Sequence, residues 1–255
     1  MSFQKLDTMK PTTLKHITMN KTLKALVSIV IIGVIISFMG CSEGKKQSGI
    51  IDGHAYVDLG LPSGTLWATC NVGAKSPQKY GGYFAWGETM QKDNYSWSTY
   101  SYGFDENKLK KYCGIQSFGY NGFVDNLTEL ELSDDVATVN WGGGWRIPTR
   151  KQWNELLDCC RYDWITYKGV NGMLFWASNG KQLFLPAAGC CCDNDLAKAK
   201  GLVGHYMTSS LCETVPKFTW KFFFDEDFGC RKLDGSDGRG TRYFGVSVRP
   251  VHNVE

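Results

Sequence analysis

The hydrophobic and polar positions from Asn140 to Leu157, NWGGGWRIPTRKQWNELL, predict a glycine turn followed by the best-defined helix of the chain. Thr149 suits the N-cap position, and Gln152, three residues later, completes a capping box. The helix is therefore predicted at 149–160, with its first turn at Arg150. Its apolar positions follow the period of one helix face and are Trp153, Leu156, Leu157 and Cys160. A stripe of this kind packs on a sheet.

Short segments with strand patterns dominate the rest of the chain. Apolar and aromatic residues at alternate positions predict strands at 56–59, 65–70, 83–86, 164–167, 173–176, 182–185, 218–224 and 244–248. Residues 169–172, which begin and end with glycine, predict the turn of a hairpin. A short helix capped by Ser133 and a long aromatic loop at 92–120, with a helical turn near 107–112, complete the pattern. The predicted class is α+β, with mostly antiparallel twisted sheets, one strong helix, one or two short helices and long loops.

The amino-terminal 40 residues have the pattern of an export signal. Residues 23–39 form an almost purely apolar run that follows two lysines and ends in a glycine and Cys41. A small residue followed by cysteine at this place is typical of lipoprotein processing, which predicts a signal peptide at 1–40 and a lipidated Cys41. An uncleaved membrane anchor is the alternative. A start at Met19 would give a leader of more ordinary length.

The 215 residues from the lipidation site onward are expected to form one domain on a short tether. Residues 41–52 are interpreted as the tether, and residues 53–252 suffice for a substantial core. The whole chain has a formal net charge of +3. The leader contains five lysines and one aspartate and so has a charge of +4, which leaves −1 for the exported part. A nucleic-acid partner is thereby excluded. The expected location is the cell envelope, at the outer membrane or the cell surface, with the lipid anchor as the membrane contact.

The sequence lacks the motifs of common catalytic chemistries. It contains no phosphate-binding glycine loop followed by Lys-Ser/Thr, no H-E-x-x-H zinc motif and no G-x-S-x-G nucleophile elbow. The histidines beyond the leader, His54, His205 and His252, are interpreted as structural or surface groups. No catalytic residue, metal ligand or cofactor is therefore assigned.

Nine cysteines remain after Cys41 is set aside. In an oxidising compartment an odd number leaves at least one thiol unpaired, and disulfides are expected among the others, with the pairing open. The triplet Cys190–Cys192 with His205 is the candidate for a soft metal site. Consecutive ligands close a tetrahedron poorly, so disulfides are the favoured interpretation.

Five segments carry a resemblance to a known family. They are YVDLGLPSGTLWATCNVGAKSP from Tyr56, YFAWGET from Tyr83, NWGGGWRIPT from Asn140, LFLPAAG from Leu183 and GVSVRPV from Gly245. In this order they resemble the Fibrobacter succinogenes major paralogous domain family of bacterial surface lipoproteins. WRIPTRKQWNELL also looks like an element of the formylglycine-generating enzyme (sulfatase-modifying factor) family, a branch of the C-type-lectin-like fold. The resemblance implies that fold, whose first and last strands pair, here 55–59 with 246–251.

The same resemblance defines the alternatives to a binding function. Formylglycine-generating enzymes use two cysteines four residues apart before the last strand, whereas here Cys230 stands alone. The proline-containing tripeptides of calcium-dependent sugar-binding lectins are also missing. The chain is therefore interpreted as this scaffold without an oxidase or calcium site. An oxidase with Cys212 or Cys230 as its reactive thiol, and a structural subunit of a surface appendage, are the alternatives.

Two irregular segments, 189–204 and 225–242, separate the resembling blocks and predict a contact surface. Loops on a rigid sheet suit recognition, and aromatic and arginine side chains dominate binding energies. The candidate contact residues are Asp193, Asp195, Tyr206, Asp225, Asp227, Phe228, Arg231, Arg239, Arg242 and Tyr243. Lectin-like folds also serve as variable proteins of diversity-generating retroelements; diversification and ordinary drift both account for the irregularity. The predicted function is a lipid-anchored binding module for a protein or glycan, and not an enzyme.

Overall fold

A computed structural model describes residues 48–235 and 238–253 of the 255-residue chain. The predicted signal peptide, Cys41 and most of the tether lie outside the described residues. Within the described ranges, no helix combines the length and the apolar character needed to cross a membrane. Strand β1 (Ser48–Ile51) pairs with β2 (His54–Asp58), so the folded part begins before residue 53, where the tether was predicted to end.

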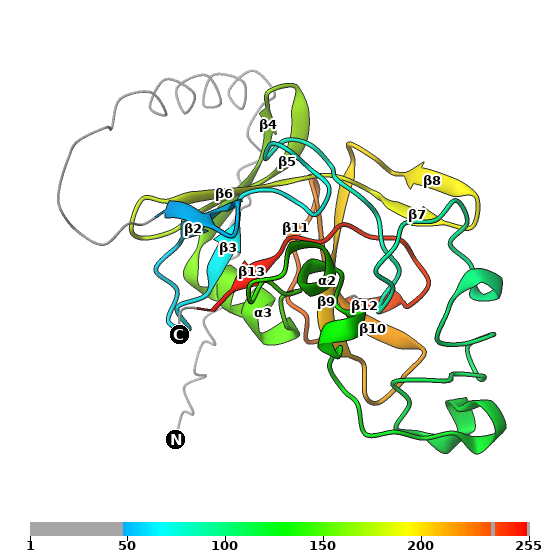
Figure 1. Cartoon of the computed structure of the whole chain (residues 1–255). Helices are drawn as coiled ribbons and strands as arrows, with labels where there is room; N and C mark the ends of the chain where they lie inside the picture. The colour runs from blue at the N-terminus through cyan, green and yellow to red at the C-terminus, as the bar shows by residue number, and fades with distance from the viewer. Residues whose placement is uncertain (1–47, 236–237, 254–255) are drawn as a thin grey trace, which may run out of the picture. The chain divides into compact units, whose positions relative to one another are not determined.

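The described chain has the predicted α+β class, with many antiparallel strands and few helices (Figure 1). One sheet has the order β1-β2-β3-β13, in which β3 is Leu66–Ala68 and β13 is Val251–His252. The last strand pairs with β3, through Val251 opposite Trp67, and not with residues 55–59 as predicted. The reason is that β1 and β3 already occupy the two edges of β2.

A second sheet contains the predicted hairpin. Its strands, in order, are β4 (Arg161–Tyr167), β5 (Val170–Trp176) and β6 (Gln182–Pro186). The turn is shorter than predicted and consists of Lys168 and Gly169, with φ of 48° and 77°. Positive φ at both central positions is what a two-residue type I′ turn requires, and it matches the twist of the flanking strands.

The third sheet carries both irregular segments at its margins. Its strands are β9 (Val203–Leu211), β10 (Phe218–Asp225), β11 (Gly229–Cys230) and β12 (Arg239–Thr241). Strand β10 pairs with all three of the others, with β11 at its end and β12 at its start. A separate hairpin of β7 (Cys190–Cys192) and β8 (Asp195–Lys198) precedes β9 and is drawn in yellow in Figure 1.

The alternation predicted for β10 holds only at one end of the strand. Phe222 and Phe224 are fully buried, as expected for the inward positions. Nearer the start, Thr219 is buried and Trp220 is half-buried, which reverses the predicted sides. The register between β10 and β9 shifts between Thr219 and Lys221, and such a bulge turns the residues before it to the other face.

Helix α3 (Arg150–Cys159) begins at the predicted residue. The Gln152 N–H donates to Thr149 Oγ1 at 3.2 Å, and the Thr149 N–H donates to Gln152 Oε1 at 3.0 Å. The predicted capping box is confirmed. Trp153 and Leu156 of the apolar stripe have no exposed surface, and α3 packs on β9 and β10.

Helix α2 (Val136–Trp141) has Asp135 as its cap and not the predicted Ser133. Asp135 Oδ1 accepts the N–H groups of Ala137 and Thr138 at 2.8 and 3.1 Å. The partial positive charge at the N-terminus of a helix also stabilises a carboxylate at this position. Ser133 belongs to the preceding 3₁₀ turn, Leu132–Asp134.

Three other predicted elements are irregular. Residues 83–86 contain a single bridge and 107–112 contain no helical turn, because Leu109 makes extended pairing with residues 118–120. Residues 244–248 do not form a continuous strand, because each residue pairs with a different segment. The backbone hydrogen bonds join Gly245 to Cys191, Val246 to Phe84 and Ser247 to His205. The other short 3₁₀ helices are Trp97–Thr99, Gln116–Phe118 and Tyr120–Gly122.

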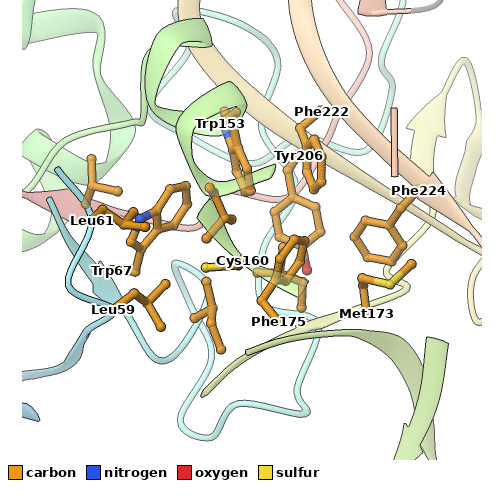
Figure 2. Packing of buried hydrophobic residues seen from close by; sticks show 14 of the residues in the cluster. Leu59, Leu61, Trp67, Trp153, Cys160, Met173, Phe175, Tyr206, Phe222 and Phe224 are labelled. Carbon is orange, nitrogen blue, oxygen red and sulfur yellow. The ribbon is translucent and has the colours of Figure 1, made fainter. Parts of the chain in front are cut away.

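The main core lies between α3 and the sheets (Figure 2). Figure 2 shows Trp153 descending from α3 between Trp67 and Phe222. Its ring is stacked on Phe222 at 4.4 Å and meets Trp67 edge-on at 4.7 Å. Its indole N–H donates to the Met207 carbonyl at 3.1 Å, so burial leaves no polar atom of this side chain without a partner. The helix thereby joins the first and third sheets.

Candidate functional site

Two of the ten predicted contact residues, Tyr206 and Arg242, belong to the interior. Both side chains are 0 % exposed, so they do not reach a ligand at the surface and the prediction is corrected for them. Tyr206 is an inward-facing residue of β9, and its hydroxyl donates to the Pro186 carbonyl at 2.8 Å. An irregular sequence identifies a variable region of the chain. Whether a side chain in or beside that region points inward or outward depends on its position in the strand.

Arg242 holds the aromatic loop 92–120 against the third sheet. Its guanidinium lies 4.9 Å from the ring of Trp86 and near Tyr112, and Nη2 donates to the carbonyls of Lys111 and Tyr112 at 3.1 and 3.3 Å. Burial lowers the pKa of this guanidinium. Nε and Nη1 have no hydrogen-bond partner in the described part of the chain. The residue is a structural cation.

Four predicted residues gather at the turn between β10 and β11, and we call them the hairpin face: Asp225, Asp227, Phe228 and Arg231. Asp225 Oδ1 accepts the N–H of Phe228 at 2.7 Å, which fixes the turn. The Phe228 side chain is 71 % exposed. The Arg231 guanidinium lies 4.9 Å from its ring and 5.7 Å from that of Phe223. Asp227 is exposed on the same turn.

Further exposed apolar side chains flank the hairpin face. Tyr162 on β4 is 39 % exposed, and its ring would lie 3.3 Å from a Cβ placed on Gly229. Leu202 is 66 % exposed and directly precedes Val203, which pairs with Asp225. Clustered exposed aromatic and aliphatic groups beside charged residues are typical of a protein contact site.

Three other predicted residues lie at the β7–β8 hairpin. Asp193 and Asp195 are exposed, and Asp193 exchanges two backbone hydrogen bonds with Tyr95, at 2.7 and 3.0 Å. Tyr243 is half-buried against Trp97, with 5.2 Å between the rings. Burial, with the Asp193 carboxylate nearby, raises the pKa of Tyr243. Cys190–Cys192 of β7 are buried, whereas the turn and Asp195, Leu196 and Lys198 of β8 are exposed.

Arg239 occupies a third place. It lies opposite Trp220, five residues before Asp225 along β10, which is about 16 Å at 3.3 Å per residue. The predicted single contact surface therefore divides into the hairpin face, the β7–β8 turn and the position of Arg239. The bases of the two irregular segments do meet, since Gly189 bridges Gly204 and Gly204 pairs with Phe224.

All nine cysteines of the described part are free thiols, which corrects the expectation of disulfides. Cys212 is buried beside Thr214, and burial together with Asp225 raises the pKa of Cys230. A raised pKa disfavours the nucleophilic thiolate at Cys230. No group of three or more His, Cys, Asp or Glu side chains within residues 48–235 and 238–253 is arranged to hold a metal ion.

His205 on β9 and Lys221 on β10 are two half-buried basic residues of the third sheet, close enough for the charge of Lys221 to act on His205. The His205 ring lies 5.0 Å from Phe223, and burial followed by the charge of Lys221 lowers its pKa to about 3. Burial also lowers the pKa of Lys221, and nearby Cys190 opposes this shift. The histidine is therefore neutral in the folded protein across the ordinary pH range.

The folded protein is expected to lose stability on acidification because of His205. Its folded pKa of about 3 lies below the unfolded value near 6.5, so the unfolded chain takes up a proton that the folded chain does not. Between pH 6.5 and 5 the loss is about 2 kcal/mol. Urea unfolding at pH 7, 6 and 5 measures it, with His205→Gln as the comparison. Equal pH dependence in both proteins would contradict the assignment.

One concave site contains residues that were not predicted. It lies beside the first turns of α3 and is lined by Thr128, Glu129, Thr149, Arg150, Lys151, Asn154, Ser210, Leu211, Glu213 and Trp220. The available signal in the sequence was the polar side of α3, opposite the apolar stripe, where Arg150, Lys151 and Asn154 lie. The remaining residues come from distant segments and only the fold brings them together.

Comparison with known proteins adds no relative to this description. No family model matches the chain, and neither a curated protein nor a solved structure is significantly similar to it.

Proposed function

We propose that this chain is a recognition module of lectin-like fold, held at the cell envelope through a lipid on Cys41, which binds a protein through the hairpin face. The observation that carries the proposal is Phe228, an aromatic side chain that is 71 % exposed on an ordered turn and is paired with a guanidinium. Burying it against a partner would remove an unfavourable apolar surface from water.

The lectin-like fold is supported by the arrangement of the chain ends. The strands nearest the two ends of the described chain, β1 and β13, belong to the same four-stranded sheet. One long helix packs on the sheet that carries the irregular segments. Loops held in this way keep their backbone positions while their side chains differ, which suits recognition.

The shape of the hairpin face favours a protein over a glycan. Phe228 and Asp227 stand on the turn that joins two paired strands, and both residues are exposed there. A protruding aromatic side chain next to an arginine is typical of an interface hot spot that enters a pocket on the partner. Glycans, in contrast, are usually bound in concave sites, as most small ligands are.

Phe228→Ala is expected to weaken partner binding at least tenfold, because a central aromatic contact contributes about 2 kcal/mol or more. The melting temperature should not change, since most of this side chain is in water. The measurement is binding of the purified full chain to an envelope-protein array and, separately, to a glycan array, followed by affinity determination for every ligand found.

Phe104→Ala is the matched control. Phe104 is 53 % exposed and has the Lys110 amine 4.5 Å from its ring, so the chemistry of aromatic ring and cation is the same at a different place. Its replacement should leave binding unchanged. Equal losses in both variants, or no loss with Phe228→Ala, would remove the hairpin face from the proposal, and glycan binding alone would replace the proposed protein partner.

A further inference from the structure

The concave site at the start of α3, which we call the helix pocket, has a volume of about 460 Å³. This lies within the range of small-molecule sites. One wall is the first part of α3, the opposite wall is residues 128–129, and Leu211 and Trp220 supply apolar surface. The helix pocket lies at the β12 end of β10, away from the hairpin face, so it is a separate site.

The wall formed by α3 is cationic and its arginine is held in place. The Arg150 guanidinium lies 3.6 Å from the Trp220 ring, and its Nε–H donates to the Leu233 carbonyl. The Leu233 N–H donates to Asn154 Oδ1 at 2.9 Å, which leaves the Asn154 amide nitrogen for other partners. Lys151 is exposed beside them. A stacked guanidinium with Nε engaged presents its two terminal nitrogens as a fork, the geometry that suits a carboxylate.

The opposite wall is anionic and equally ordered. Glu129 accepts from the Ser210 hydroxyl at 2.5 Å and from the Ser209 hydroxyl at 2.6 Å, so both carboxylate oxygens are fixed. Ser210 Oγ also accepts the N–H of Arg150 at 2.9 Å, which joins the two walls. Glu213 is exposed at the same site. With one hydroxyl hydrogen bond on each oxygen, the Glu129 carboxylate can still accept from a ligand ammonium group.

The four charges face one cavity without neutralising one another. Arg150, Lys151, Glu129 and Glu213 form no ion pair with any residue of the described ranges. The net charge of the lining is zero, which offers no advantage to a simple anion or cation. A ligand with one charge of each sign complements both walls.

We propose that the helix pocket binds a short peptide with free ends, its carboxylate at Arg150 and Lys151 and its ammonium group at Glu129 and Glu213. Leu211 and the edge of Trp220 then contact the side chains between the ends. The volume limits the bound part to a few residues. This site is independent of the protein contact proposed for the hairpin face.

Titration calorimetry of the purified full chain with tri-alanine tests the proposal. N-acetyl-tri-alanine and tri-alanine amide each lack one of the two charges. Each modification is expected to weaken binding at least tenfold. N-acetyl-tri-alanine amide has both ends blocked and lacks both charges. Equal binding of this peptide and of free tri-alanine, or no binding of free tri-alanine, would overturn the proposal. A penalty for amidation alone would also overturn it and indicate a site for anions.

Variants assign each peptide end to a wall. In Glu129→Gln the penalty for acetylation should disappear while that for amidation persists, and Arg150→Met should show the reverse. Arg150→Lys retains the charge without the fork and should bind with intermediate affinity.

The matched controls are Arg161→Met and Asp163→Asn, which remove exposed charges on β4. Phe228→Ala should leave tri-alanine binding unchanged, so failure at one site is distinguishable from failure at the other. Penalties that persist unchanged in both pocket variants would refute the assignment.

Discussion

Replacing Trp153 by alanine is expected to lower the free energy of unfolding by about 3–5 kcal/mol. The side chain has no exposed surface, stacks on Phe222 and meets Trp67, so its removal leaves a cavity between two sheets. The Met207 carbonyl also loses its donor at a buried position, which adds to the loss. Urea unfolding followed by circular dichroism measures the effect.

Two further variants separate the contributions at Trp153. Trp153→Phe keeps an aromatic ring on Phe222 but removes the N–H, and about 1–2 kcal/mol of loss is expected. Trp141→Ala is the matched control, because Trp141 stacks on His54 at 3.7 Å but is only half-buried. It should cost about 1 kcal/mol. A loss below that value for Trp153→Ala would mean that α3 does not organise the core.

The second large effect is expected from Arg249→Met, at about 3–5 kcal/mol. Arg249 is 0 % exposed, and its Nε donates to Asn71 Oδ1 at 2.8 Å. Its Nη1 donates to the carbonyls of Ala68 and Thr69 at 3.2 and 3.0 Å. Methionine fills much of the volume but leaves three acceptors without a donor, next to the end of β3. Each orphaned acceptor destabilises the fold by about 1–3 kcal/mol.

Arg242→Met is the informative comparison for this effect. Arg242 is equally buried, but only its Nη2 donates hydrogen bonds, to two carbonyls. Methionine there leaves two carbonyl acceptors without this donor, against three acceptors at Arg249, so a smaller loss of about 2–3 kcal/mol is expected. The same unfolding measurement applies to both variants. Equal losses would show that the burial of the cation, and not its hydrogen bonds, decides the stability.

The sequence by itself determined the elements whose cause is local. The capping box of Thr149 and Gln152 depends on residues three apart and was predicted residue by residue. The hairpin was predicted as well, although its turn consists of Lys168 and Gly169 and not of residues 169–172. The α+β class follows from the number and type of such local elements. The exposed aromatic Phe228 was likewise identified from its segment alone.

Only the tertiary structure decided which partner each segment meets and which way its side chains point. Arg242 ends one irregular segment and Tyr206 follows the other by two residues, yet both are buried, because β9 and the aromatic loop determine their surroundings. Strand β13 pairs with β3 because β2 has no free edge. The helix pocket joins segments near 128, 150 and 210, and contacts between residues so far apart depend on the packing of the whole chain, which local patterns do not encode.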